Sequence, residues 1–175
     1  VRFGKKIADI IIGTLHDDEQ ADKELAEWCD VAKVLHALKG ARLGLMGRVL
    51  EAMYDMHADP TAVASAFGVH VPLIEISDLM EAYHEVTEEE IAEKSKLILE
   101  EFETPEPVSD PVTKKLTDAD LRQAAKSAVA LDKLVAKFNL DGMAYYYEGK
   151  EGTEDRTVAT SLIVGNSILN AKGIP

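Results

Sequence analysis

The feature that most constrains this chain is a strand-helix-strand pattern in its first half. Residues 41–47 form a short apolar run that stops at a glycine. Asp59 and Pro60 then open a helix that ends before Gly68, because proline is favoured at the first position of a helix. Residues 69–76 form a second apolar run. Two strands joined through a helix are the unit of a parallel sheet, so the pattern predicts an α/β protein.

Helical periodicity and capping signals predict further elements on both sides of this unit. Residues 7–15 form an isoleucine-rich candidate strand, and a helix is predicted from Asp17 or Asp18 to residue 38. After residue 76 the sequence predicts a short helix from residue 77, a helix over 87–102, a helix over 117–138, a strand over 141–147 and a helix over 155–172. Thr87 with Glu90, and Thr117 with Asp120, have the spacing of capping boxes. Gly173 is predicted to cap the last helix in a left-handed conformation.

These elements predict a doubly wound, mostly parallel sheet with helices on both faces, in Rossmann-like or flavodoxin-like layers. We expect residues 1–175 to form a single α/β domain, with an internal proline-rich linker at 104–112. The sheet is expected to be incomplete at both ends. The strand-like run near the start has no partner before it, and Ile174-Pro175 should lead into another strand. The chain is therefore interpreted as the middle part of a longer protein.

Composition narrows the classes of partner. The chain has 32 acidic and 19 basic residues, a net charge of −13, and such a surface repels phosphate backbones and anionic lipids. No apolar run approaches the ~18 residues of a membrane span. Cys29 is the single cysteine, which excludes an internal disulfide; we expect it to be a small buried residue on a helix. Nucleic acid and membrane are thus poor partners, and the cytoplasm is the expected compartment.

Ligands of doubly wound sheets bind at the carboxyl ends of strands, and two such ends carry distinctive side chains. One of these ends is at residues 44–48, where Arg48 can pair with an anion or a carboxylate, or lie on the surface. Tyr145, Tyr146 and Tyr147 end another strand. Three tyrosines can wall a sugar-sized pocket, or they can pack between sheet and helix, and the sequence does not separate these alternatives.

Polar residues at positions 53–59 form a third candidate patch. His57 and Asp59 have a spacing that can contribute to a metal site. The interpretation we favour is a polar loop in which Asp59 caps the following helix. The glycines at positions 44 and 47 lack the remainder of a nucleotide-binding fingerprint, and no Ser-His-Asp, Cys-His or HExxH arrangement is visible.

The order of these segments resembles the middle domain of the L-arabinose and L-fucose isomerase superfamily. A tryptophan-bearing helix around residues 25–28 runs into an A-R-x-G strand at 41–44, and residues 140–148 (LDGMAYYYE) resemble the family strand that carries an aromatic pocket residue. Residues 171–175 (AKGIP) resemble the turn before the family's G-E-G-D segment. The resemblance covers nearly the whole chain.

This resemblance implies an activity, a cofactor and a set of site residues. Members of the superfamily convert an aldose to its ketose with a divalent metal, usually manganese, bound by two glutamates and two histidines. The implied ligands lie beyond Pro175, so this chain would carry no metal ligand and no catalytic residue. It would contribute pocket wall through Tyr147 at the family's aromatic position, with Tyr145 beside it, and through Gly47 and Arg48. The implied partners are a monosaccharide and further copies of the parent subunit, which is expected to be a homo-oligomer.

Two other functions remain open from the sequence. One is a non-catalytic sugar-binding or sensor module of similar α/β form. The other is a generic doubly wound domain whose function lies in contacts with partner proteins.

Overall fold

The computed structural model describes residues 10–48, 50, 52–53, 57–104 and 115–175. The chain divides into two compact units, Val1–Gly40 and Ala41–Pro175. The sheet, its surrounding helices and the core clusters all belong to the second unit.

Within the first unit the described residues form one helix, α1 (Glu19–Leu38). Asp18 caps it by accepting a hydrogen bond from the Ala21 N–H at 3.1 Å. The strand predicted over residues 7–15 is wrong for residues 10–15, which contain no strand, and residues 7–9 lie outside the described residues. The predicted burial of Cys29 is also wrong, because its side chain is exposed. None of the residues of α1 is buried.

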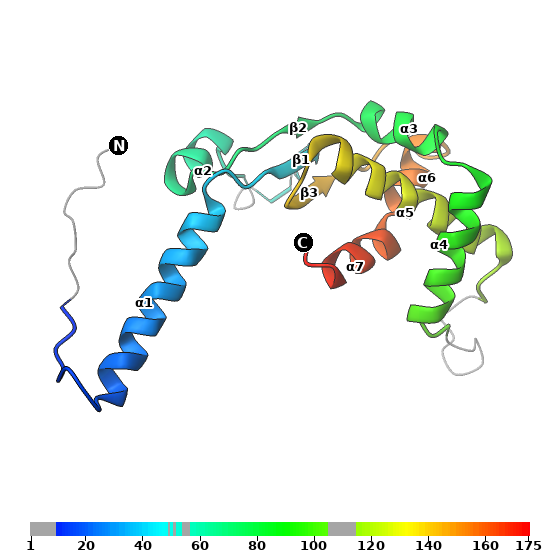
Figure 1. Cartoon of the computed structure of the whole chain (residues 1–175). Helices are drawn as coiled ribbons and strands as arrows, with labels where there is room; N and C mark the ends of the chain where they lie inside the picture. The colour runs from blue at the N-terminus through cyan, green and yellow to red at the C-terminus, as the bar shows by residue number, and fades with distance from the viewer. Residues whose placement is uncertain (1–9, 49, 51, 54–56, 105–114) are drawn as a thin grey trace. The chain divides into compact units, whose positions relative to one another are not determined.

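The second unit contains a parallel sheet of three strands, β1 (Leu43–Gly47), β2 (Leu73–Ile74) and β3 (Gly142–Tyr146). Figure 1 shows β1 in the middle, and the strand order is β2-β1-β3. The α/β class and the parallel pairing predicted from the sequence are therefore confirmed.

The strand β2 is shorter than the predicted run of residues 69–76. Pairing with β1 nevertheless begins earlier, since the Leu43 N–H donates to the His70 carbonyl and the Leu45 N–H donates to the Pro72 carbonyl, both at 2.9 Å. Proline has no N–H to donate in return, which interrupts the regular ladder at position 72.

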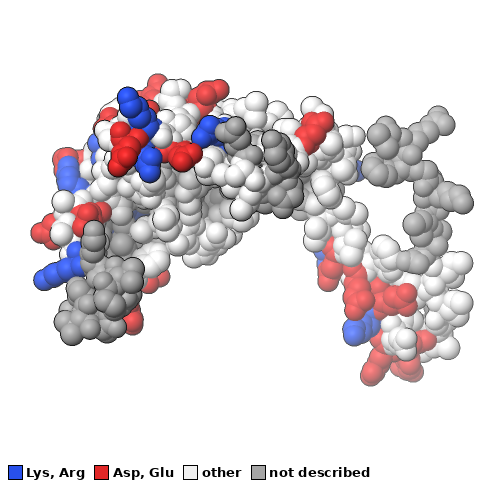
Figure 2. Space-filling view, turned by 180° about the vertical axis from the view of Figure 1, so that it is seen from behind, with Lys and Arg blue, Asp and Glu red and all other residues white. Residues whose placement is uncertain are grey.

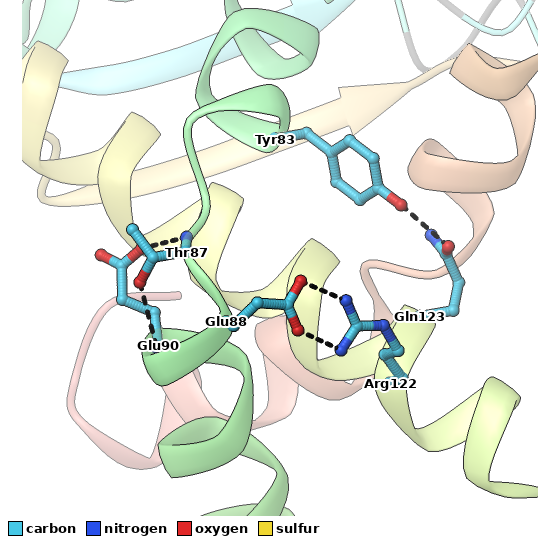
Figure 3. Close-up of polar contacts among 6 residues, drawn as sticks. All are labelled: Tyr83, Thr87, Glu88, Glu90, Arg122 and Gln123. Atoms are coloured by element: carbon cyan, nitrogen blue, oxygen red, sulfur yellow. Dashed lines mark hydrogen bonds and ion pairs between the residues drawn. The ribbon is translucent and has the colours of Figure 1, made fainter.

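Six helices complete the part of the second unit that the structure describes. They are α2 (Pro60–Phe67), α3 (Ile76–His84), α4 (Glu88–Glu101), α5 (Asp118–Phe138), α6 (Glu154–Thr160) and α7 (Ile163–Ala171). The predicted capping boxes of α4 and α5 are both present, and Figure 3 shows that of Thr87 and Glu90. Gly173 has a φ of +82°, as its predicted left-handed cap requires.

The single helix predicted over residues 155–172 is wrong, because the structure has two helices that meet near Ser161. The Ser161 hydroxyl donates to the Thr157 carbonyl at 2.6 Å, and the Thr160 hydroxyl donates to the Arg156 carbonyl at 2.8 Å. Hydroxyls that bond the carbonyls of the preceding turn compete with the helical ladder and favour a bend at this point.

Helix α5 forms the centre of the packing, with α3, α4 and α7 against it. Its Leu131 and Leu134 are fully buried in a cluster with Met46 of β1 and Leu79 of α3. A smaller cluster joins Ile91 and Ile98 of α4, Ala125 of α5 and Ile168 of α7. The helices are thus held to one face of the sheet mainly by burial of apolar side chains.

Polar contacts add specific ties between α5 and its neighbours. The Tyr83 hydroxyl donates to the Gln123 side-chain oxygen at 2.9 Å. Both terminal guanidinium nitrogens of Arg122, Nη1 and Nη2, donate to the Glu88 carboxylate (Figure 3). Lys94, whose side chain is 10% exposed, pairs with Asp132 at 2.5 Å. A lysine with so little exposure needs such a partner, because burial of an unpaired charge is costly.

The opposite face of the sheet is less covered by helices. Leu43 and Leu45 are partly buried and line an open apolar groove together with Val63 of α2. A packed second layer of helices is not present among the described residues of this unit, so the doubly wound arrangement stays a prediction. The linker at 104–112 also stays a prediction, since residues 105–112 lie outside the described residues.

Charged side chains of both signs are mixed on the surface. Figure 2 shows basic side chains next to acidic ones on the face in view. Ion pairs of the second unit include that of Lys133 with Glu90 and that of Lys137 with Glu81. None of the helices in the described part of the chain is both long enough and apolar enough to cross a membrane.

Candidate functional site

The carboxyl ends of β1 and β3, the two strand ends that the sequence analysis singled out, lie together. Gly47 is in register with Tyr146, and the Arg48 N–H donates to the Tyr146 carbonyl at 3.0 Å. The residues just past the two strands therefore meet at one edge of the sheet. We call Gly47, Arg48, Tyr146 and Glu148 the strand-end cluster.

Gly47 permits this close approach of the two strands. Its φ is +81°, in the region that side chains rarely adopt. A Cβ atom at this position would lie 2.2 Å from the Tyr146 carbonyl oxygen. Only glycine fits both the backbone conformation and the available space.

Arg48 and Glu148 form an ion pair across the cluster. An Arg48 guanidinium nitrogen (Nη2) lies 3.1 Å from a Glu148 carboxylate oxygen (Oε2), and both side chains are more than half exposed. The guanidinium carbon is 5.9 Å from the centroid of the Tyr146 ring. The Tyr146 hydroxyl lies 3.4 Å from the same glutamate oxygen. These contacts orient the guanidinium while leaving it open to solvent.

The other two tyrosines of the strand end lie against helices. The Tyr147 hydroxyl donates to an Asp155 carboxylate oxygen of α6 at 3.4 Å, and its ring is half-buried. The Tyr145 hydroxyl accepts a hydrogen bond from the Asn166 side chain of α7 at 2.9 Å. Tyr145 also packs against the main core cluster. Of the predicted site residues, Gly47 and Arg48 thus lie at the end of β1 beside β3. Tyr147 contacts α6 through Asp155, and Tyr145 contacts α7 through Asn166.

Within the patch at positions 53–59, Asp59 has the capping role that we favoured. The Asp59 carboxylate accepts hydrogen bonds from the Thr61 N–H at 2.8 Å and the Thr61 hydroxyl at 2.7 Å, and so caps α2. These bonds, the hydroxyl one above all, lower the pKa of Asp59. His57 approaches the Leu50 carbonyl at 3.3 Å. Residues 54–56 lie outside the described residues.

No group of three or more histidine, cysteine, aspartate or glutamate side chains with the spacing of a metal site exists in the described part of the chain. The described residues therefore do not fit the implied manganese ion. The strand-end cluster offers the ring and hydroxyl of Tyr146 and a paired guanidinium, which suit a polar ligand rich in hydroxyls.

The sequence analysis gave no role to Glu148, and it included Tyr146 only among the three tyrosines that can wall a pocket. The signal that identifies Glu148 is its charge opposite to that of Arg48. Arg48 lies one residue beyond the end of β1 and Glu148 two residues beyond the end of β3. That signal needs the register of β1 with β3, because Arg48 and Glu148 are 100 residues apart.

Comparison with known proteins gives one family. No curated protein shows a significant match to the chain. The family described as the L-arabinose isomerase central domain matches residues 49–156, which is more than half of the chain. This span includes β3, Tyr145, Tyr147 and Glu148, whereas Gly47 and Arg48 lie immediately before it. The resemblance seen in the sequence is thereby confirmed, and the chain belongs to the L-arabinose isomerase central-domain family.

Proposed function

We propose that this chain is part of a metal-dependent aldose-ketose isomerase and forms one wall of its monosaccharide pocket. The observation that carries the proposal is the meeting of Gly47, Arg48 and the tyrosine-bearing end of β3 in a chain of this isomerase family. The carboxyl edge of a parallel sheet is where α/β proteins bind their ligands.

The proposed wall has the chemistry that a sugar requires. The Tyr147 ring supplies an apolar face for the CH groups of the sugar, and hydroxyls and the Arg48 guanidinium supply hydrogen bonds. Gly47 lets the backbone of β3 lie close to the end of β1, because the Tyr146 carbonyl occupies the space of a side chain. Tyr145 is also proposed as a pocket residue, and its hydroxyl accepts a hydrogen bond from the Asn166 side chain.

The metal ligands of the isomerase are proposed to lie outside this chain. We expect calorimetric titration of the chain with manganese chloride to show no stoichiometric binding. Stoichiometric uptake would contradict this expectation and would direct attention to Asp55, His57 and Asp59. A matched titration of the Asp59→Asn variant would then test whether Asp59 is among the ligands.

The pocket role is tested by Tyr147→Ala in the intact isomerase. We expect a loss of about tenfold in kcat/KM, the size typical of removing one aromatic packing surface and its hydrogen bond. Tyr147→Phe is the matched control, because it keeps the ring and removes only the hydroxyl, and it should retain most of the activity. Unchanged kcat/KM in Tyr147→Ala would contradict the pocket role.

A sugar-binding module without catalysis predicts a different result. In that case the chain alone would bind a monosaccharide tightly in the absence of metal, and the parent protein would not interconvert aldose and ketose. A metal-dependent interconversion of pentoses by the parent protein would favour the isomerase.

A further inference from the structure

Resting on the proposed function, we infer that Glu148 is a specificity-determining residue of the strand-end cluster. It neutralises Arg48, so that the site accepts an uncharged polyol and rejects an anionic sugar such as a sugar acid. The substrate class is thereby set by a residue that need not touch the reacting atoms.

The geometry supports a paired guanidinium rather than a free one. Glu148 lies 3.1 Å from Arg48, and the same carboxylate oxygen is the one nearest the Tyr146 hydroxyl. The Tyr146 ring lies against the guanidinium from another side. Arg48 is thus held by one opposite charge and one ring, while its exposed edge still offers N–H donors to a neutral hydroxyl.

The charge of an unpaired arginine would change what this edge binds. A guanidinium matches carboxylate and phosphate groups in a two-bond geometry, so arginine without a partner selects anions. With Glu148 in place, an anion must either displace the carboxylate or lie close to it. Both alternatives are unfavourable, because like charges repel and the existing ion pair is lost.

The test uses the whole chain and two ligands of matched shape. L-arabinitol and L-arabinonate have the same five-carbon chain, but the first is neutral and the second has a carboxylate at C1. Each is titrated at low ionic strength, where exposed charges are least screened. Binding is followed through the backbone amide signals of Arg48 and Tyr146 by NMR.

We expect Glu148→Gln to gain about fivefold in affinity for L-arabinonate, the size expected for one exposed charge pair. The affinity for L-arabinitol should stay within about twofold, since a neutral ligand does not respond to the change of charge. Glu151→Gln is the matched control. It removes one carboxylate from the same loop, outside the ion pair with Arg48, and should leave both affinities unchanged.

Three results would overturn the inference. The first is an absent gain for L-arabinonate in Glu148→Gln. The second is an equal gain in Glu151→Gln, which would reflect net charge alone. The third is a gain that persists when Arg48→Gln is added to Glu148→Gln, since another cation such as Arg156 would then hold the anion.

Failure of the proposed function gives a different result from failure of this inference. L-arabinitol could shift no amide signal while Glu148→Gln raises the affinity for L-arabinonate through Arg48. The neutralisation of Arg48 by Glu148 would then stand, and the sugar pocket would lose support. If L-arabinitol binds the unchanged chain at the strand-end cluster and Glu148→Gln gains nothing, the pocket stands and the role of Glu148 is lost.

Discussion

At the scale of single residues, Gly47 shows how one position fixes the geometry of the site. The Tyr146 carbonyl occupies the space where a Cβ atom would lie, and it accepts the Arg48 N–H. The same contact therefore excludes a side chain at position 47 and orients the backbone of Arg48.

We predict that Gly47→Ala destabilises the chain by about 3 kcal/mol, because it adds a backbone clash to the strain of a positive φ. Gly152→Ala is the matched control. Gly152 has a similar φ of +80° but nothing within 4 Å of the added Cβ, so the cost should be about 1 kcal/mol. Urea unfolding followed by circular dichroism measures both, and equal losses in the two variants would show that the clash with Tyr146 is relieved by a small shift.

At the scale of elements, the helices are fixed by local capping chemistry. The Thr87 hydroxyl accepts the Glu90 N–H, and the Glu90 carboxylate accepts the Thr87 N–H at 2.8 Å. Thr117 and Asp120 repeat this arrangement at the start of α5. Such residues are recognisable in the sequence because both partners lie within one helical turn.

These caps make stability depend on pH in a defined direction. The Thr87 N–H, and then Lys133, hold the pKa of Glu90 below its ordinary value of 4.5, and Arg122 does the same for the pKa of Glu88. A carboxyl group with a lowered pKa in the folded state stabilises the fold above its unfolded pKa. That contribution is lost as the pH falls through the lowered pKa.

We therefore predict that the urea midpoint falls as the pH is lowered from about 5 to about 3. Glu90→Gln should be less stable than the unchanged chain at neutral pH and should show a flatter pH profile in this window. Glu93→Gln, on the same helix but outside the capping box, is the control. An identical slope in Glu90→Gln and the unchanged chain would show that Glu90 contributes nothing to this pH dependence.

At the scale of the whole molecule, the buried core is confined to one part of the chain. Every residue of the two core clusters falls between Met46 and Ile174, within the unit Ala41–Pro175. In α1, by contrast, none of the residues is buried. The apolar surface that drives cooperative folding thus belongs to the second unit.

We predict that a chain of residues 41–175 folds by itself and unfolds in a single cooperative transition. Its near-ultraviolet circular dichroism should retain the signal of the buried Tyr83. Thermal and urea unfolding followed by two probes would measure this, and non-coincident transitions would contradict it. The Leu131→Ala variant is the control for core dependence and should lose several kcal/mol, about the cost of a buried leucine.

The sequence by itself determined the α/β class. It also determined the helix caps at Asp59, Thr87 and Thr117, and the glycines at which helices end. These features are local, because each depends on residues within a turn or two of one another. It also identified two strand ends as candidate ligand positions, since α/β proteins bind ligands at the carboxyl ends of strands.

Only the tertiary structure decided the rest. The division of the last helix near Ser161 depends on hydroxyl-carbonyl bonds that compete with a periodic pattern typical of one helix. The exposure of Cys29 was not evident from the apolar periodicity of its helix, because none of the residues of α1 is buried. The pairing of Arg48 with Glu148 depends on the register of β1 with β3. Residues 100 positions apart meet only because long-range strand pairing brings them together, and no local pattern encodes that contact.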